Sequence, residues 1–291
     1  GAPQLAECRA PGGRIVTRYL IRRTLLLLLT LLVTSFIIFA LTNLLPGDIA
    51  RLVLGRDASS TAIANFNAQF GLDAPPLVQY GRWLGGFVTA DWGRSFTAGN
   101  PPVRPLVLAR LSNSLRLAGL TLLIAIPLSL LLGVLAALRE NTWVDSTISV
   151  MSLSVVGLPE FVTGIVLINV FALGLGWLPT TSLVSSSMNP GAWLRVLILP
   201  AITASLVLVG YITRMTRAGM LEELRKPYVR TAMLKGLPWR RVVFGHALRN
   251  ALLPTIAVIA LSIGWLMGGL VVIENVFNYP GIGRDRKSTR L

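Results

Sequence analysis

Five long apolar segments set the pattern of hydrophobic and polar positions along this chain. They lie at residues 24–45, 115–138, 147–173, 193–213 and 251–273. Each is long enough to cross the hydrocarbon core of a lipid bilayer, which takes about 20 apolar residues in a helix. The pattern therefore predicts an all-α, polytopic membrane protein in which polar loops join five transmembrane helices.

The first apolar segment follows a basic stretch, as the apolar region of a signal peptide would. The basic residues are Arg14, Arg18, Arg22 and Arg23. The segment is longer than the roughly 7–15 residues of a signal peptide's apolar region, and no small-x-small cleavage site follows Leu41 before Pro46. We expect it to remain in the protein as a membrane anchor.

The composition agrees with a membrane protein and limits the kinds of chemical site that the chain can contain. Of 291 residues, 53% are hydrophobic and 13% are charged, which is not typical of a soluble domain of this length. Cys8 and His246 are the single cysteine and histidine, so the sequence offers neither an intramolecular disulfide nor a histidine cluster for a metal. Paired carboxylates and a nucleophile elbow are also missing from the sequence, so we expect no catalytic and no metal site.

The formal net charge of +15 has two possible explanations. Basic residues that bind nucleic acid gather in one patch among exposed aromatic residues, whereas here they stand mostly at the ends of apolar segments. The positive-inside rule explains that placement, so we expect contact with the lipid bilayer and no nucleic-acid partner. By the same rule the N-terminus, the loop at Arg139 and residues 214–250 are cytoplasmic.

The basic stretch at residues 214–250 carries the most specific pattern. Its residues fall on two faces of a short helix: Val229, Ala232, Met233 and Gly236 on one, and Tyr228, Thr231 and Lys235 on the other. Gly236 followed by Pro238 is typical of a helix end. A short amphipathic helix with small residues on one face and cations on another is suited to a groove in a cytoplasmic partner.

The outer loop at residues 46–113 is too patterned for a plain linker. It contains GLDAPPLVQYGRWL and TADWGRSF, in which aromatic and turn residues are interleaved. Five apolar residues recur there at helical spacing: Leu77, Tyr80, Trp83, Leu84 and Phe87. We expect an ordered extracytoplasmic cap with a short helix that lies on the membrane surface or packs on the spans.

Glu160 is a carboxylate near the middle of the third apolar segment, directly after Pro159. A proline frees a backbone carbonyl and kinks a helix, and an ionisable group inside the membrane is a functional candidate. Two interpretations stay open. Glu160 lines a translocation path and attracts a cation or a peptide amino group, or it pairs with an arginine of a partner subunit.

Gly264 and Gly268 form a G-x-x-x-G pattern in the fifth apolar segment, followed by Gly269. Small residues at this spacing let helix backbones approach closely. We expect these glycines to pack within the subunit or against a second subunit rather than to contact solute.

These features together resemble the permease subunits of ABC importers of the dipeptide, oligopeptide and nickel type, which are binding-protein-dependent transport system inner membrane components. The similar motifs are RYLIRR before the first apolar segment, LLPGD after it, FGLD and DWG in the outer loop, and YVRTA, KGL and HALRNALLP in the basic stretch. Arg230, Thr231, Ala232 and Gly236 match the family's EAA-x-x-x-G coupling loop, with Arg230 in place of the acidic residue.

The resemblance implies a mechanism and a set of partners. An extracytoplasmic solute-binding protein delivers solute, a homologous second permease completes the path, and two ABC ATPase subunits dock on the coupling helices. It assigns the coupling helix to Tyr228, Arg230, Thr231, Ala232, Lys235, Gly236 and Leu237. The sequence lacks the G-x-x-x-x-G-K-[ST] loop that cradles phosphates, so we expect ATP and Mg on the partner ATPases and no cofactor on this chain.

The resemblance also divides the chain. It implies an N-terminal tail at residues 1–13, the first span with its outer loop at 14–112, a permease core at 113–283 and an atypical tail at 284–291. In the family a sixth span follows the NYPGIGR motif, so we expect the core to be truncated.

The expected function is a permease subunit, not an enzyme, that forms half of the path for di- or oligopeptides across a bacterial cytoplasmic membrane. The same importer type also carries nickel, glutathione and other small solutes, and this alternative stays open. The alternative from another class is an ion-driven secondary carrier. Such a carrier is expected to show more intramembrane ionisable residues and inverted repeats.

Overall fold

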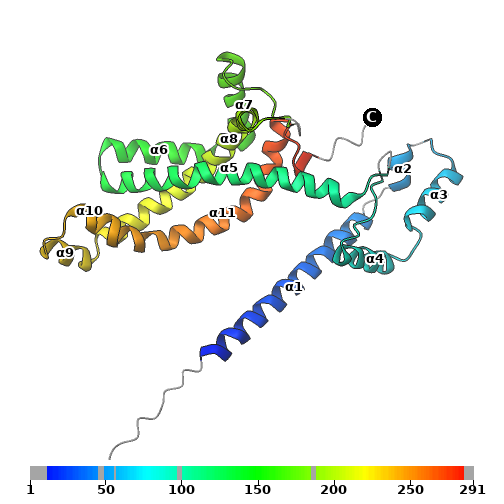
Figure 1. Ribbon diagram of the computed structural model, residues 1–291, viewed down its shortest axis with the longest axis horizontal. Helices are drawn as coiled ribbons and strands as arrows, with labels where there is room; N and C mark the ends of the chain where they lie inside the picture. The colour runs from blue at the N-terminus through cyan, green and yellow to red at the C-terminus, as the bar shows by residue number, and fades with distance from the viewer. Residues whose placement is uncertain (1–11, 45–48, 56, 97–99, 185–187, 285–291) are drawn as a thin grey trace, which may run out of the picture. The chain divides into compact units, whose positions relative to one another are not determined.

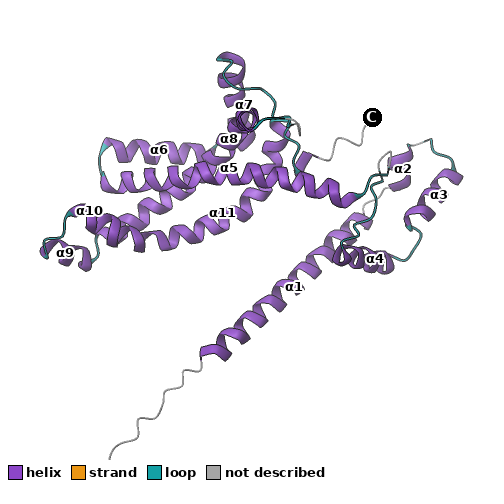
Figure 2. Cartoon of the chain, viewed as in Figure 1, coloured by secondary structure: helices purple, strands orange, loops and turns teal. Residues whose placement is uncertain are grey.

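The computed structural model describes residues 12–44, 49–55, 57–96, 100–184 and 188–284. Every named element in these ranges is a helix (Figure 2). Contacts divide the chain into two units, residues 1–104 and 105–291. The tails expected at 1–13 and 284–291 lie almost wholly outside the described residues.

The described residues of the first unit form one long helix and three short ones (Figure 1). The long helix α1 (Gly12–Leu44) contains an apolar stretch of 26 residues, so the anchor predicted at its position is confirmed as a helix long enough to span a bilayer. The short helices are α2 (Ile49–Leu54), α3 (Ser60–Phe70) and α4 (Pro76–Thr89).

Helix α4 packs on α1 through one aromatic residue. The ring of Tyr80 lies 5.2 Å from that of Phe36 and 5.4 Å from that of Phe39, and its hydroxyl is 2.8 Å from Ser35 Oγ. The short helix predicted from the aromatic spacing is therefore confirmed, and it packs on a span as expected. Of the five residues that predicted it, Tyr80 is the buried one.

The second unit contains the remaining long helices. In chain order its elements are α5 (Val103–Leu138), α6 (Trp143–Gly157), α7 (Glu160–Leu167), the π-helical turn η1 (Ile168–Gly174), α8 (Pro190–Leu224), α9 (Pro227–Leu234), α10 (Trp239–Arg241), the π-helical turn η2 (Val242–Ala247), α11 (Leu248–Val276) and the 3-10 turn η3 (Ile282–Arg284). Figure 1 shows α5, α6, α8 and α11 gathered in one bundle.

Helix α8 is the centre of that bundle. Helices α6, α7 and α11 all pack on it, and 72% of an apolar 18-residue stretch of α8 is buried. The core around it includes Leu208 and Ile212 of α8 together with Leu117 of α5 and Leu270 of α11. A helix that is surrounded by other helices has little surface in contact with solvent. The hydroxyl groups of its buried Thr203 and Thr216 therefore donate hydrogen bonds to backbone carbonyls one turn earlier in α8.

Three glycines allow the helices to approach α8 closely. A Cβ atom on Gly133 of α5 would lie 2.8 Å from the carbonyl oxygen of Thr213, and one on Gly219 would lie 2.7 Å from that of Ala251. On Gly210 it would lie 2.7 Å from the carbonyl oxygen of Ser152. Small residues therefore set the spacing of α5, α6 and α11 around α8, as is usual where helices pack in a membrane.

The predicted all-α, polytopic class is confirmed. Among the described residues, 4 helices are long and apolar enough to span a membrane, or up to 5 if the bent pair α6–α7 counts as one span. The third span, predicted at residues 147–173 with a kink at Pro159, corresponds to this bent pair. The chain breaks between Gly157 and Glu160, and α6 and the α7–η1 segment meet at an angle of 107°.

The boundaries of the other spans also differ from the prediction. Helix α5 begins at Val103, ahead of the predicted start at 115, and α8 continues to Leu224, beyond the predicted end at 213. Arg214 and Arg217, which were assigned to the basic loop, therefore belong to α8. The hydrophobic pattern located the apolar cores of these helices but not their polar extensions, which are helical because they continue an established helix.

Candidate functional site

Helix α9 is the short helix predicted in the basic stretch, and its ends follow from local sequence. Lys226 at the N-cap is extended, with ψ 147°, and Pro227 occupies the first turn. The helix ends at Leu234, Lys235 caps it, and Gly236 adopts a left-handed φ of 76°. The predicted helix and its stop are confirmed.

One detail of that prediction was wrong. Since α9 ends at Leu234, Gly236 follows the helix and does not extend the stripe of small residues on its face. Val229 is buried and Ala232 is half-buried, while Arg230, Thr231, Met233, Lys235 and Gly236 are exposed. The side of α9 that carries Val229 is thus packed against the rest of this chain, and the side that carries the basic residues is exposed.

A carboxylate at the end of α8 attaches α9 to it. Glu223 is 8% exposed; its Oε1 accepts from Lys226 Nζ and its Oε2 from the Tyr228 hydroxyl at 2.6 Å. Burial, followed by the Glu223 carboxylate, raises the pKa of Tyr228, so the hydroxyl keeps the proton that it donates. The pKa of Lys226 is also raised, mainly because its ammonium group donates a hydrogen bond to Glu223. These contacts join the first turn of α9 to the preceding span.

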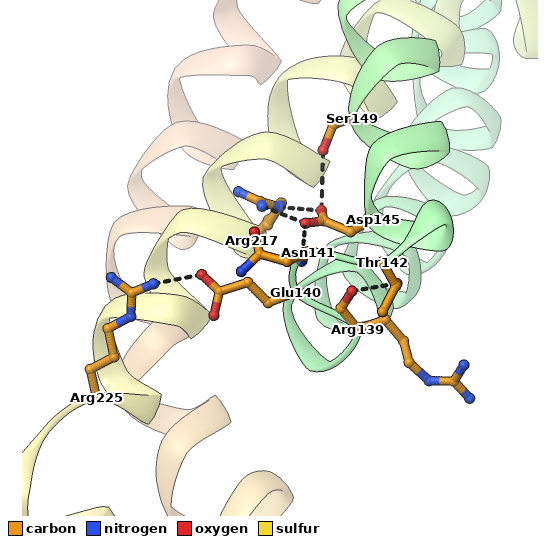
Figure 3. Close-up of polar contacts among 8 residues, drawn as sticks. All are labelled: Arg139, Glu140, Asn141, Thr142, Asp145, Ser149, Arg217 and Arg225. Carbon is orange, nitrogen blue, oxygen red and sulfur yellow. Dashed lines mark hydrogen bonds and ion pairs between the residues drawn. The ribbon is translucent and has the colours of Figure 1, made fainter.

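A second ionic cluster connects α8 to the turn between α5 and α6 (Figure 3). Arg217 binds Asp145 with two hydrogen bonds, from Nε to Oδ1 at 2.6 Å and from its terminal nitrogen to Oδ2 at 2.7 Å. Asp145 is 5% exposed and also accepts from the backbone N–H of Asn141 at 3.1 Å and from Ser149 Oγ at 3.3 Å. A planar, bidentate pair of this kind fixes direction as well as distance.

The cluster continues toward α9 through a more exposed pair. Arg225, the last residue before the α9 N-cap, donates to Glu140 Oε1 at 2.5 Å. In Figure 3 the two pairs lie one above the other along α8, with the α5–α6 turn beside them. The turn, the end of α8 and the base of α9 therefore form one connected unit, which we call the ionic junction: Glu140, Asp145, Arg217, Glu223, Arg225, Lys226 and Tyr228.

Sequence reasoning missed the ionic junction. Its two cross-helix pairs join residues 72 and 85 positions apart, and no local spacing signals such pairing. The available signal was the presence of Asp145 at the start of an apolar segment, since a carboxylate there needs a partner.

Glu160, predicted in mid-span, lies at the break between α6 and α7. Pro159 is extended, with ψ 137°, and serves as the N-cap, so Glu160 is the first residue of α7. The kink expected from Pro159 is therefore confirmed and is a complete break. Glu160 lines a cavity of about 350 Å³ together with Pro159, and its Oε2 is buried without a hydrogen-bond partner among the described residues.

The three glycines of α11 differ in their surroundings. A Cβ atom on Gly264 or Gly268 would meet no atom of the described residues within 4 Å, so the close packing expected within this subunit or against a second one is not made by the described part of this chain. On Gly269 it would lie 3.2 Å from both carboxylate oxygens of Glu160. Gly269 thus makes room for Glu160, while contact of the other two with a second subunit stays a prediction.

A further buried carboxylate, in α11, was not predicted. Glu274 of α11 is 1% exposed, accepts from Ser114 Oγ of α5 at 2.5 Å and from the backbone N–H of Gly283 at 2.8 Å. A Cβ atom on Gly281 would collide with this carboxylate. Glu274 therefore holds the turn after α11 against α5, and its hydrogen bonds account for its burial.

The fold and the site define a class: a multi-pass, α-helical membrane protein with a short exposed helix attached by charged groups to the end of its central span. Comparison with known proteins narrows this class. The family model for the binding-protein-dependent transport system inner membrane component matches residues 129–290, and the model for the N-terminal part of such membrane components matches residues 16–114.

Similar proteins match nearly the whole chain. It is 37% identical over 270 residues to a putative peptide transport system permease protein of Brucella melitensis, covering 93% of this chain and 85% of that protein. It is 37% identical over 268 residues to the oligopeptide transport system permease protein AppB of Bacillus subtilis, covering 91% and 85%. It is 35% identical over 266 residues to the glutathione transport system permease protein GsiC of Escherichia coli, covering 91% and 84%.

The chain therefore belongs to the family of binding-protein-dependent transport system inner membrane components, the permease subunits of ABC importers. It is a multi-pass protein of the inner membrane and a transport subunit. Subunits of this kind work with an ATPase and a binding protein.

Proposed function

We propose that this chain forms half of the translocation path of an ABC importer for di- or oligopeptides. The observation that carries the proposal is the match to permeases named for peptide and oligopeptide transport over more than nine-tenths of the chain. The other half of the path belongs to a homologous second permease. An extracytoplasmic binding protein delivers the peptide, and two ABC ATPase subunits bind and hydrolyse ATP with Mg.

Helix α9 is the part of this chain that meets an ATPase. Its inner edge is held to α8 through Glu223, while Arg230, Thr231 and Lys235 are exposed. Tyr228, Ala232, Gly236 and Leu237 shape the helix and the turn after it. Movement of the ATPase then displaces the end of α8, and the Asp145–Arg217 pair passes this displacement to α6. The basic side, including the N-terminus, faces the cytoplasm.

The path side of the subunit includes Pro159 and Glu160. They lie at the break between α6 and α7, where the backbone departs from a continuous helix. Irregular backbone at membrane depth is tolerated where it faces protein or a water-filled cavity, and a cavity of about 350 Å³ adjoins this break.

Reconstitution tests the proposal. The chain would be purified with its ATPases, its second permease and its binding protein, and uptake into proteoliposomes measured for alanyl-alanine, glutathione and nickel ion. We expect ATP-dependent uptake of the dipeptide. Uptake of nickel without uptake of the dipeptide would contradict the proposal, and so would uptake driven by an ion gradient without ATP.

Glutathione transport is the second candidate, because the chain is 35% identical to a permease named for it. The same assay separates the two. A dipeptide that competes with glutathione for uptake indicates a general peptide importer, while uptake of glutathione without competition by dipeptides indicates a dedicated one.

A further inference from the structure

The cavity beside Glu160 has one charged side chain among its described lining residues. Its walls come from α6, α7, α8 and α11 and are otherwise apolar or aromatic, and they include Tyr211 and Trp265, which are 50% and 48% exposed. Glu160 Oε2 is buried and has no hydrogen-bond partner in the described part of the chain. A buried carboxylate without a partner costs free energy, which a cation placed beside it offsets.

A second cavity adjoins the first and has a different character. Its volume is about 230 Å³, and it shares Tyr211 and Trp265 with the cavity beside Glu160. Its other walls are Leu208, Val258, Leu261 and Ser262, so none of its described lining residues is charged. Two aromatic side chains therefore stand between a cavity with one carboxylate and a cavity that is almost wholly apolar.

This order of groups matches one end of a peptide. A free amino terminus carries an ammonium group on the same carbon as the first side chain, so a cation and an often apolar group lie next to each other. Aromatic faces favour ammonium groups as well as apolar side chains. The carboxyl terminus does not match, because it would bring a second negative charge toward Glu160.

We infer that the two cavities form a binding site for the amino-terminal end of the cargo during its passage. Glu160 receives the protonated α-amino group, Tyr211 and Trp265 flank it, and the first side chain enters the apolar cavity. Gly269 leaves room for this carboxylate: an added Cβ would lie 3.2 Å from both of its oxygens, so a larger residue would push against it. This inference rests on the proposed peptide transport and adds which end of the peptide is recognised.

The test compares alanyl-alanine with N-acetyl-alanyl-alanine in proteoliposomes that hold the complete importer. Each peptide is supplied at a concentration that saturates the binding protein, so that differences arise in the membrane part. We expect wild type to favour the free amino terminus by about tenfold or more, as for a charge-assisted hydrogen bond. We expect Glu160→Gln to lose most of this preference, and Glu160→Asp to keep part of it.

The control is Glu222→Gln, an equivalent change at an exposed carboxylate of α8 outside both cavities. It should keep the wild-type preference. Trp265→Leu should slow uptake of both peptides, and Gly269→Leu should resemble Glu160→Gln because it displaces the carboxylate. Co-purification of the second permease with each variant establishes that the complex has assembled.

Two outcomes would overturn the inference. The first is an unchanged preference in Glu160→Gln while wild type transports the dipeptide. The second is loss of the second permease from Glu160→Gln preparations, since Glu160 would then pair with a partner subunit instead of cargo. Failure of wild type to transport any peptide would instead contradict the proposed function, so the two failures are distinguishable.

Discussion

At the scale of single residues, Glu223 is the buried carboxylate that attaches the first turn of α9 to α8. It accepts from both Lys226 and Tyr228, and its neighbour Glu222 lies on the same helix with 74% of its side chain exposed. Both adjacent glutamates face Lys226, but Glu222 does so only at 3.8 Å and from an exposed position, whereas Glu223 is buried and also accepts from Tyr228. This difference provides a matched pair for mutagenesis.

We predict that Glu223→Ala uncouples transport from ATP hydrolysis. The change removes both acceptors, so the first turn of α9 is no longer attached to α8. Hydrogen bonds to charged groups contribute about 1.5–3 kcal/mol, so the peptide transported per ATP should fall about tenfold. The measurement is uptake and phosphate release in the same proteoliposomes, with Glu222→Ala as the control that stays near wild type. Equal losses in the two variants would contradict the role assigned to Glu223.

A second matched pair distinguishes the buried ion pair from the exposed one. Arg217→Gln leaves Asp145 buried without its bidentate partner, which should lower the free energy of unfolding by about 3 kcal/mol, the lower end for a broken buried pair because Arg217 keeps 29% of its side-chain exposure. Arg225→Gln removes a partner whose side chain is 71% exposed, so the change should be about 0–1 kcal/mol. Thermal unfolding in detergent measures both. Similar melting temperatures for the two variants would show that Asp145 does not depend on Arg217.

At the scale of elements, the end of α9 is determined by backbone conformation. Gly236 has a φ of 76°, and a Cβ atom on it would meet no atom of the described residues within 4 Å. The requirement within the subunit is therefore left-handed backbone, which glycine adopts readily, asparagine tolerates and β-branched residues resist.

We predict that Gly236→Val impairs coupling much more than Gly236→Asn does. Valine at positive φ costs about 1–2 kcal/mol and shifts the turn into α10, whereas asparagine keeps the turn. Coupled uptake and binding of the ATPase to the purified permeases would be measured for both variants. If asparagine were as harmful as valine, Gly236 would be needed for close approach of the partner and not for its conformation.

The elements also show how far the sequence alone leads. The spacing of Tyr80 and Trp83 predicts α4, and the Gly236–Pro238 stop predicts the end of α9, because both depend on neighbours a few residues away. Pro159 signalled a kink, but the 107° break depends on how α6 and α7 pack on α8. The Asp145–Arg217 and Ser114–Glu274 contacts join residues 72 and 160 positions apart. Such pairs follow from the fold and have no local periodicity.

At the scale of the whole molecule, α11 has two different sides. One side packs on α8 and contributes Leu266 and Leu270 to the core. Gly264 and Gly268 lie apart from it, and no atom of the described chain comes within 4 Å of a Cβ placed on either. Glycines four residues apart permit close contact between helices, and the proposed importer includes a second, homologous permease.

We predict that this open face of α11 contacts the second permease. Gly264→Leu and Gly268→Leu should reduce co-purification of that permease, because a leucine on either would hold the two backbones apart. The control is Gly119→Leu on α5, where a Cβ likewise meets nothing within 4 Å but no glycine follows four residues later. All three variants should insert and resemble wild type in thermal unfolding as isolated subunits, since none of these positions packs within the chain. Loss of the second permease in the Gly119 variant alone would place the contact on α5, and normal co-purification of both α11 variants would leave the glycine pair facing lipid.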